Sequence, residues 1–549
     1  MLAFTKHGRI AVGLALALAA TTANAGPTVS KANVWTYWMT PASTPTSNYA
    51  NLESSSWSCA VETALITPAD SSAYFVHRAP SKTAHCIVDL SNDSPIIGDN
   101  VYPEVVLFKR EPLSSNLQTG DEIEAWYWRS LSALSTFNDG QGKSWQESGQ
   151  ESFSIAPVQS WSSPEILSKG DGWMLLTVTE KTLASIDRFA TSDTRIQRLA
   201  FRPTSSYHSL SPTGEVEIGF GVGEKSQNKK PEPKFRKPRH NDVIAKLVSS
   251  SALDPQRILK DVRILTGEDK QPKAVGEWHT RHSSTYGARL AGKWIKQQLE
   301  ESLSRLNGSW CEHWEYSPYF APNVVCHIAS TATLSSTGSN VQSKEEDEAL
   351  VVISAHFDSR GTFGSTTAPG GDDDASGTSA LLGIARVIGS SQLGFKSPIQ
   401  LVAFSGEEQG LVGSQYYAKH LSDSQIGVNL AIQMDMLAYR SPGEPMQIAF
   451  PDKLSTVSAT RYVQQIAHIY APQLEQGYTP ACCSDHQSFW ENNFPATWVF
   501  ERNGPIADPM YHNSADTTDR QGYDVNQLAA IAKVVTATLL DIAAFHMLV

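Results

Sequence analysis

Residues 349–359 read ALVVISAHFDS, an apolar run that ends in polar residues. Such a run is typical of a strand that is buried on both faces of a sheet. Two similar runs follow, PIQLVAFSGEE at 398–408 and VNLAIQMDM at 428–436. Three segments have the composition or spacing of helices, at 286–306, 375–391 and 524–545. Strands that alternate with helices predict an α/β sheet covered on both faces.

A second stretch, APGGDDDASGTSALLG at 368–383, places Asp372, Asp373 and Asp374 side by side before a predicted helix. Three adjacent carboxylates repel one another, and an acidic triplet taken alone is most often a solvated loop. The alternative is that a cation lies among them.

Polar side chains fall at the carboxyl ends of the predicted strands, where the chemistry of such sheets gathers. They are His356, Asp358, Glu407, Glu408 and Asp435, with His512 in a loop near the end of the chain. Imidazole nitrogen and carboxylate oxygen are ligands that suit zinc. A carboxylate between two cations can bridge them, so Asp373 could serve two metal ions, whose charge would relieve the repulsion in the triplet.

The motifs AHFDS, GGDDDASG, FSGEEQGLVGS, QMDM and YHNSADT occur in this order, and TRHSSTYGA precedes them at 280–288. The series resembles the di-zinc aminopeptidase family, which includes secreted bacterial leucyl aminopeptidases and has glutamate carboxypeptidases and glutaminyl cyclases as relatives. The resemblance covers about residues 243–549. It implies a zinc-exopeptidase-like fold with a mixed, mainly parallel sheet, and the removal of N-terminal residues from peptides with a free N-terminus.

The resemblance also implies five ligands for two zinc ions: His356, Asp373, Glu408, Asp435 and His512. Asp373 would bridge the two ions. His356 and Asp435 would complete one site, and Glu408 and His512 the other.

Two further residues receive catalytic roles from the resemblance. Glu407 would be the general base that takes a proton from a water shared by the two zinc ions. Asp358 would accept a hydrogen bond from the ring of His356 and fix its orientation. The peptide bond between Asp373 and Asp374 would be cis, as is typical of the family.

Four apolar residues near the motifs suggest a pocket for the first substrate residue, although they could equally be core: Met436, Phe494, Trp498 and Phe500. Secreted leucyl aminopeptidases close this pocket with two cysteines, separated by three residues, in front of SDH. This chain has Cys483 at the second position but Thr479 at the first. A preference for leucine therefore does not follow from the resemblance.

Three other functions stay open. A carboxypeptidase would need a cation to bind the substrate carboxylate, for which Arg440 or Arg502 are candidates. A glutaminyl cyclase normally uses one zinc ion, and the complete set of ligands argues against it. A binding role could apply to the N-terminal region. Neither HExxH nor GxSxG around a serine occurs, so no competing hydrolytic motif is present.

The first 25 residues have the pattern of a secretory signal peptide. Lys6 and Arg9 precede a short apolar run, and residues 23–25 form a small-x-small cleavage site that would leave Gly26 first. The expected location is secreted or periplasmic. No other apolar run approaches the roughly 20 residues of a span, so no membrane span is expected.

Six cysteines suit an oxidising compartment. Proximity suggests the pairs Cys59–Cys86 and Cys311–Cys326. The neighbours Cys482 and Cys483 could form a disulfide with each other or stay reduced.

The composition divides the mature chain into three parts. Residues 26–223 hold eight of the 14 tryptophans in short alternating runs, which predicts a mostly β domain acting as an accessory or a pro-region. Residues 224–242 contain seven Lys or Arg and three Pro, which predicts an exposed linker open to proteolysis. Residues 243–549 form the predicted peptidase domain. The net charge of −12 argues against nucleic acid as the main partner.

Overall fold

The structure is a computed structural model that describes thirteen stretches of the chain. They are residues 35–41, 62–66, 74–80, 96–100, 104–110, 164–170, 172–190, 193–203, 233–331, 349–362, 365–391, 393–481 and 483–547. The predicted signal peptide lies outside these residues.

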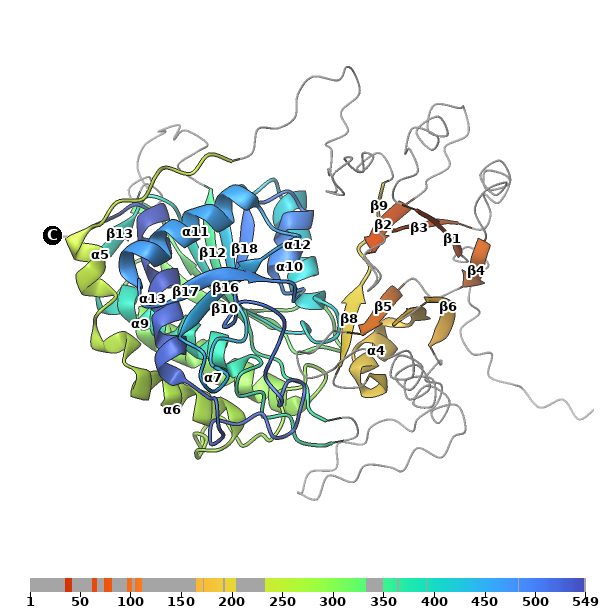
Figure 1. Ribbon diagram of the computed structural model, residues 1–549, viewed down its shortest axis with the longest axis horizontal. Helices are drawn as coiled ribbons and strands as arrows, with labels where there is room; N and C mark the ends of the chain where they lie inside the picture. The colour runs from red at the N-terminus through yellow and green to blue at the C-terminus, as the bar shows by residue number, and fades with distance from the viewer. Residues whose placement is uncertain are drawn as a thin grey trace, which may run out of the picture.

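The C-terminal region is built on a six-stranded sheet, in the order β10-β11-β14-β12-β15-β18 (Figure 1). Its strands are β10 (Ser309–Trp314), β11 (Asn323–Ile328), β14 (Ile399–Phe404), β12 (Leu350–His356), β15 (Val428–Met434) and β18 (Ala496–Val499). The last four in this order run parallel, whereas β10 and β11 pair antiparallel. The sheet is therefore mixed and mainly parallel, as predicted.

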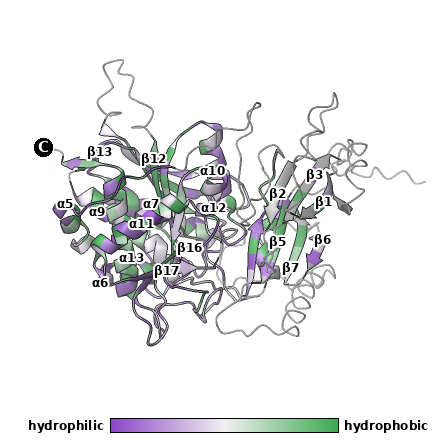
Figure 2. Cartoon of the chain, turned by 45° about the horizontal axis from the view of Figure 1, so that its top comes forward, coloured by the Kyte–Doolittle hydropathy of each residue, from purple (hydrophilic) through white to green (hydrophobic). Residues whose placement is uncertain are grey.

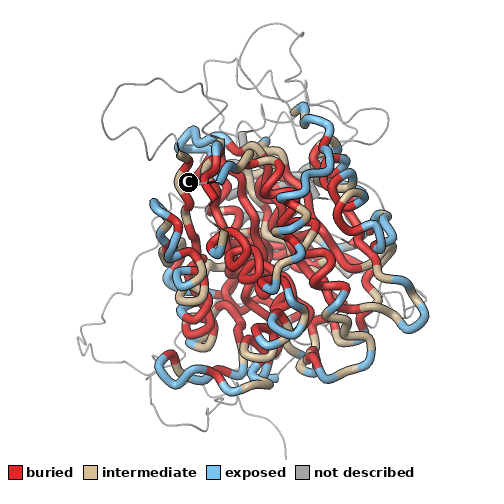
Figure 3. The backbone as a smooth tube through the Cα atoms, turned by 90° about the vertical axis from the view of Figure 1, so that its left-hand side faces the viewer, coloured by how far each residue is buried: buried red, intermediate tan, exposed pale blue. Residues whose placement is uncertain are grey.

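Helices cover both faces of this sheet. They are α5 (Asp242–Leu247), α6 (Pro255–Thr266), α7 (Tyr286–Leu303), α9 (Ala375–Ser390), α10 (Val412–Asp423), α11 (Val457–Tyr470), α12 (His486–Glu491) and α13 (Val525–Ile542). The larger core cluster joins one face to α6, α7, α9, α11 and α13, and a second cluster joins the other face to α10 and α12. Figure 3 shows this buried interior, with the exposed residues mainly at the periphery. The predicted strands and helices of this region are confirmed by β12, β14, β15, α7, α9 and α13.

Two short strand pairings complete the region. β13 (Leu393–Phe395) pairs with β19 (Phe545–Met547), and β16 (Gln447–Pro451) pairs with β17 (Glu475–Thr479). Among the described residues, α13 alone is long and apolar enough to cross a membrane. Most of α13 is buried against the sheet and its neighbouring helices, as in the core helix of a soluble domain, so this helix is no argument for a span.

The described N-terminal strands form two antiparallel sheets, β4-β1-β3-β2-β9 and β6-β7-β5-β8. The first contains β1 (Trp35–Pro41), β2 (Glu62–Ile66), β3 (Tyr74–Pro80), β4 (Ile96–Asn100) and β9 (Arg202–Pro203). The second contains β5 (Glu104–Arg110), β6 (Glu165–Gly170), β7 (Trp173–Val178) and β8 (Thr194–Arg198). Apolar residues concentrate on its central strands β5 and β7 (Figure 2). The side chain of Trp173 is buried there, and the other tryptophan side chains of residues 26–223 lie outside the description.

The second N-terminal sheet shares a hydrophobic cluster with the C-terminal region. Phe108, Met174 and Ile196 of this sheet belong to one buried cluster with Phe320 and Val412. The contact between the two regions is thus apolar at its centre. Such a contact holds the regions together through the same burial of apolar surface that stabilises a core.

The predicted linker is described from Pro233 onward, and most of that part is exposed. Two of its residues attach it to the C-terminal region. Phe235 stacks on Tyr462 with ring centres 5.1 Å apart, and Arg236 pairs with Asp541 at 2.9 Å. The end of the linker is therefore tied to α11 and α13.

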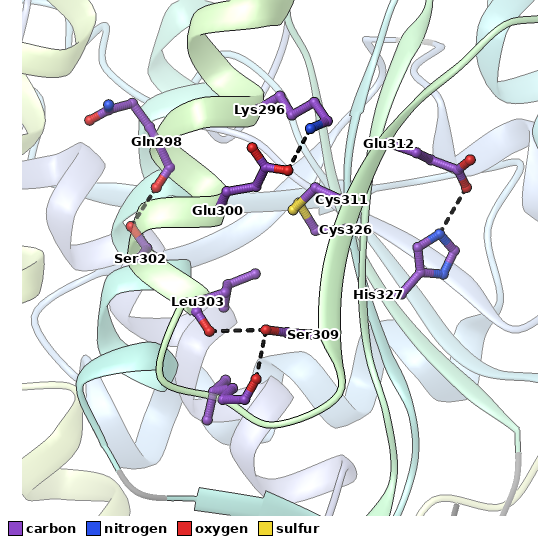
Figure 4. The surroundings of a disulfide bond; sticks show 11 residues. Lys296, Gln298, Glu300, Ser302, Leu303, Ser309, Cys311, Glu312, Cys326 and His327 are labelled. Atoms are coloured by element: carbon purple, nitrogen blue, oxygen red, sulfur yellow. Dashed lines mark hydrogen bonds and ion pairs between the residues drawn. A yellow bond between two sulfur atoms is a disulfide. The ribbon is translucent and has the colours of Figure 1, made fainter. Parts of the chain in front are cut away.

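The predicted disulfide Cys311–Cys326 is confirmed, and it joins residues directly opposite each other on β10 and β11 (Figure 4). Glu312 follows Cys311 and His327 follows Cys326 in the sequence, and their side chains pair diagonally across the two strands at 3.0 Å. Cys483 is also disulfide-bonded, which excludes a reduced state for it. Cys482 and the predicted pair Cys59–Cys86 lie outside the described residues.

Candidate active site

Seven polar residues predicted from the sequence meet at the carboxyl edge of the parallel strands. Each of these residues is at most 6% exposed: His356, Asp358, Asp373, Glu407, Glu408, Asp435 and His512. Strands β12, β14 and β15 deliver five of them because parallel strands end at the same edge of a sheet. The loop before α9 adds Asp373, and a late loop adds His512, whose backbone has a positive φ of 52°.

Two clusters of possible ligands share the carboxylate of Asp373. Its Oδ1 lies 3.2 Å from Nε2 of His356, which in turn lies 3.5 Å from Asp435. Its Oδ2 lies 3.4 Å from Nε2 of His512, which in turn lies 3.1 Å from Glu408. Two atoms that each lie about 2.0–2.1 Å from one tetrahedral zinc ion are roughly 3.3 Å apart. The spacing in both clusters therefore suits a zinc ion, with Asp373 between the two positions.

Asp374 also lies close to His356 and Asp435, so its carboxylate competes with Asp373 for the role of ligand. Its oxygens are engaged elsewhere. Oδ1 accepts a hydrogen bond from the Gly377 N–H at 2.8 Å, which caps α9, and Oδ2 accepts one from the His356 N–H at 3.2 Å. Asp373 is therefore the carboxylate that faces both clusters. The Asp373–Asp374 peptide bond is cis, as the resemblance implies.

Asp372 has a third role within the acidic triplet. Its Oδ1 accepts a hydrogen bond from the Ala438 N–H at 2.7 Å, which ties the triplet to the chain beyond β15. Burial raises the pKa of Asp372 to about 7, because a charged carboxylate is poorly solvated there. The three aspartates that adjoin in sequence thus anchor the loop, face the candidate metal positions and cap a helix.

Two arginines hold the loop that carries the triplet. Arg281, from the TRHSSTYGA segment, is fully buried and donates hydrogen bonds to main-chain oxygens of Phe357 at 2.7 Å and Gly370 at 2.9 Å. Arg520 pairs with Asp516, whose carboxylate accepts from the N–H groups of Asp372 and Asp373. These contacts hold the loop in position.

The predicted contact between His356 and Asp358 differs in the structure. Nδ1 of His356 lies 3.2 Å from the main-chain oxygen of Asp358 and 3.6 Å from its carboxylate. The carboxylate instead accepts hydrogen bonds from the N–H groups of Glu407 and Glu408, both at 3.3 Å. The backbone of Asp358 orients the histidine, and its side chain positions the two glutamates.

Glu407, the predicted base, lies beside this double cluster and is 2% exposed. Burial raises its pKa to about 7, and the neighbouring Arg195 and His356 act in the opposite direction. Nη2 of Arg195 donates a hydrogen bond to Oε1 of Glu407 at 2.6 Å. No motif in the sequence pointed to Arg195, which is 212 residues away from Glu407 in the chain and comes from β8.

The donor set fits divalent cations. His356 Nε2 and Glu408 Oε1 are buried and make no hydrogen bond to the described residues. Burial raises the pKa of Glu408 well above its ordinary value, with Asp373 and Glu407 adding to the effect. Buried carboxylates of this kind are stable as anions when they are paired or bind a metal ion. Nitrogen and oxygen donors together favour zinc over magnesium or calcium.

A small pocket opens beside Asp373 and Asp435. Its apolar wall consists of Met436, Ala481, Cys483, Trp498, Phe500, Ile506 and Tyr511, and Arg195 also contributes to the lining. Met436, Trp498 and Phe500, three of the four residues suggested from the sequence, line this pocket. The prediction for Phe494 is wrong, because Phe494 packs with Phe489 in the cluster on the other face of the sheet.

Thr479, which stands where the family has a cysteine, supports the pocket with hydrogen bonds. Its hydroxyl donates to the Gly504 carbonyl at 2.8 Å and accepts from the Ala481 N–H at 3.0 Å. Thr479 therefore joins two loops that border the pocket without a covalent bond.

The two arginines considered for binding a substrate carboxylate form ion pairs outside the pocket. Arg440 binds Asp524 at 2.6 Å, and Arg502 binds Glu444 at 2.7 Å. Neither arginine belongs to the residues that line the pocket.

Comparison with known proteins agrees with this geometry. Residues 338–539 match the model of peptidase family M28. A probable zinc metalloprotease of Pyrenophora tritici-repentis is 33% identical over 198 residues, 34% of this chain and 40% of that protein's length. A probable leucine aminopeptidase of Arthroderma otae is 24% identical over 61% of this chain and 86% of its own length.

The fold is similar to that of a solved structure as well. The crystal structure of the Legionella pneumophila LapA aminopeptidase aligns with a TM-score of 0.53 and 17% identity, over 81% of this chain and 99% of that one. Residues 338–539 of the chain are thus similar to peptidase family M28.

Proposed function

We propose that this protein is a zinc-dependent aminopeptidase that removes the N-terminal residue from peptides. The observation that carries the proposal is the pair of ligand clusters that share Asp373, with the buried carboxylate of Glu407 beside them. His356 and Asp435 would hold one zinc ion with Asp373, and Glu408 and His512 would hold the other. Such ions supply a Lewis acid and an acidified water.

The remaining steps belong to the chain's own residues. Glu407 would take a proton from the attacking water at its carboxylate and deliver it to the leaving amine. Burial of Glu407, which raises its pKa, makes the carboxylate a better proton acceptor. Asp358 would keep Glu407 and Glu408 in their different positions through their backbone N–H groups.

The pocket favours an aminopeptidase over a carboxypeptidase. The carboxylates of Asp373 and Asp435 border it, and they would attract the ammonium group at the start of a peptide. The apolar wall formed by residues such as Met436 and Trp498 would accept an apolar first side chain. The disulfide Cys311–Cys326 favours an oxidising compartment, in agreement with export of the protein.

Blocking each end of a peptide substrate tests this polarity. Acetylation of the N-terminal amine should lower kcat/KM by about 10–100-fold or more, because charge-assisted hydrogen bonds to the amine are lost. Amidation of the C-terminal carboxyl group should leave the rate nearly unchanged. Both are measured by chromatography of the products from matched peptides. Cleavage of the acetylated peptide together with failure on the amidated one would point to a carboxypeptidase.

We also propose that residues 243–549 are a separately folded peptidase domain. Limited proteolysis of the full chain should cut within residues 224–242, first before Pro233, because Phe235 and Arg236 bind the later part to α11 and α13. The two fragments should still elute together in gel filtration, since Phe320 and Val412 share a buried cluster with the N-terminal sheet. An unfolded C-terminal fragment after the cut would show that the domain boundary is wrong.

A further inference from the structure

Strand β8, at the edge of the second N-terminal sheet, brings a cation into the candidate active site. The Arg195 guanidinium donates to Oε1 of Glu407 at 2.6 Å, and it also lines the pocket beside Asp373. The Arg195 side chain is 14% exposed and that of Glu407 2%. A charge-assisted hydrogen bond with this little solvent is among the stronger single contacts in a protein.

Several polar contacts hold this part of the N-terminal region in place. Arg360, four residues after His356, donates to the main-chain oxygens of Thr194 at 2.9 Å and Ala190 at 3.1 Å. Arg198 and Gln415 exchange two hydrogen bonds, at 2.8 and 3.0 Å. Each contact joins the neighbourhood of Arg195 to a residue of the C-terminal region.

Two more features show how closely the two regions fit. Asp187 pairs with His282 at 2.8 Å, and both side chains are buried. Gly410, two residues after Glu408, has a positive φ of 110°, and a side chain there would meet the backbone N of Arg198 at 2.4 Å. The glycine therefore lets β8 lie directly on the turn that carries the two glutamates.

The position of Arg195 conflicts with the proposed use of the site. A peptide's N-terminal ammonium is a cation that would be drawn to the same group of buried carboxylates. Two cations held a few ångströms apart in a poorly solvated pocket repel one another strongly. In addition, a guanidinium bound to Glu407 occupies an oxygen that the base would offer to the attacking water.

We infer that the N-terminal region is a built-in competitor of the substrate, in which β8 holds Arg195 on the catalytic base. Arg195 and the amine of a peptide then exclude each other. The inference rests on the proposed function for the identity of the site. It adds that Arg195 regulates the site, and that it does so by weakening substrate binding.

Removal of the charge at Arg195 in the full-length protein tests this. Arg195→Gln, and Arg195→Met as a second variant that keeps an unbranched stem, should raise kcat/KM on an aminoacyl substrate about tenfold or more, the factor expected for one charge-assisted hydrogen bond. Arg195→Lys keeps a cation and should stay near the parent protein. Lys169→Gln removes a charge from β6, at the opposite edge of the same sheet, and should change nothing.

Binding is measured separately from turnover. A dipeptide with a free amine and a reduced, non-cleavable peptide bond is titrated into each zinc-loaded protein in a calorimeter. Arg195→Gln and Arg195→Met should bind it about tenfold more tightly. If they bind it tightly but no variant cleaves any peptide, the competitor is real and the proposed function is wrong.

Two results would overturn the inference while leaving the proposed function intact. One is equal cleavage and equal binding in the parent protein and both uncharged variants. The other is a loss of cleavage confined to peptides that begin with Asp or Glu, which would make Arg195 a residue that binds the substrate side chain.

Discussion

Replacement of Glu407 by glutamine is expected to lower kcat by roughly 10²–10⁴-fold, the usual contribution of a general base. Glutamine keeps the size of the side chain and a hydrogen-bonding oxygen, but it cannot take a proton. Zinc should remain bound, because Glu407 belongs to neither ligand cluster. Steady-state kinetics with peptide amides and metal analysis of the same preparation check both statements.

The neighbouring residue provides the matched control. Glu408→Gln makes the same chemical change one position along the chain, but it alters a carboxylate that lies 3.1 Å from His512. This variant should lose zinc as well as activity, and added zinc should restore part of the rate. Near-normal turnover in Glu407→Gln would show that another group is the base.

The fold of the C-terminal region could be predicted because its strands are buried on both faces. A continuous apolar run such as that of β12 has few alternatives to a central strand, and polar residues at its end mark the edge where a site forms. The ends of the predicted strands therefore located five of the seven polar residues that the structure brings together, whereas Asp373 and His512 lie in loops. The sequence pattern could not say what each carboxylate contacts, because that depends on the turns that follow the strands.

Three contacts in the structure could not be predicted from the pattern of residues along the sequence. The carboxylate of Asp358 accepts hydrogen bonds from two backbone N–H groups at 3.3 Å and lies 3.6 Å from the His356 ring, because the turn after β14 brings those N–H groups close. Phe494 lies near the motifs in sequence but packs on the opposite face of the sheet. Arg195 reaches Glu407 through the packing of two regions, and no local pattern records such a contact.

The acidic triplet is a further case in which the sequence could not predict the contacts of individual side chains. The triplet left two alternatives, a solvated loop or a cation among the carboxylates, and Asp373 was the residue expected to bridge two metal ions. In the structure they point to different partners: Asp372 to the Ala438 N–H, Asp373 to two histidines and Asp374 to the start of α9. Separate partners relieve part of the repulsion, so the case for metal ions rests on Asp373 and its neighbours.

Removal of the metal ions is expected to abolish hydrolysis, and substitution at Asp373 should show that the two sites are linked. The zinc-reconstituted protein should contain two zinc ions per chain. Asp373→Asn should weaken both sites, because each oxygen of this carboxylate faces a different histidine. The loss of activity should exceed the roughly 10–100-fold that follows when a partner of a metal ligand is removed.

His327→Gln is the control for the metal measurement, because His327 is a partly exposed imidazole on β11 paired with Glu312, outside both clusters. This variant should keep two zinc ions and full activity. Glu408→Gln should fall to one ion, since the cluster of His356 and Asp435 stays intact. Elemental analysis after dialysis against zinc, and again after chelation, gives the count for each variant. If the parent protein bound one ion at saturation, or if Asp373→Asn still held two, Asp373 would not be a bridge and the arrangement of two linked sites would have to be abandoned.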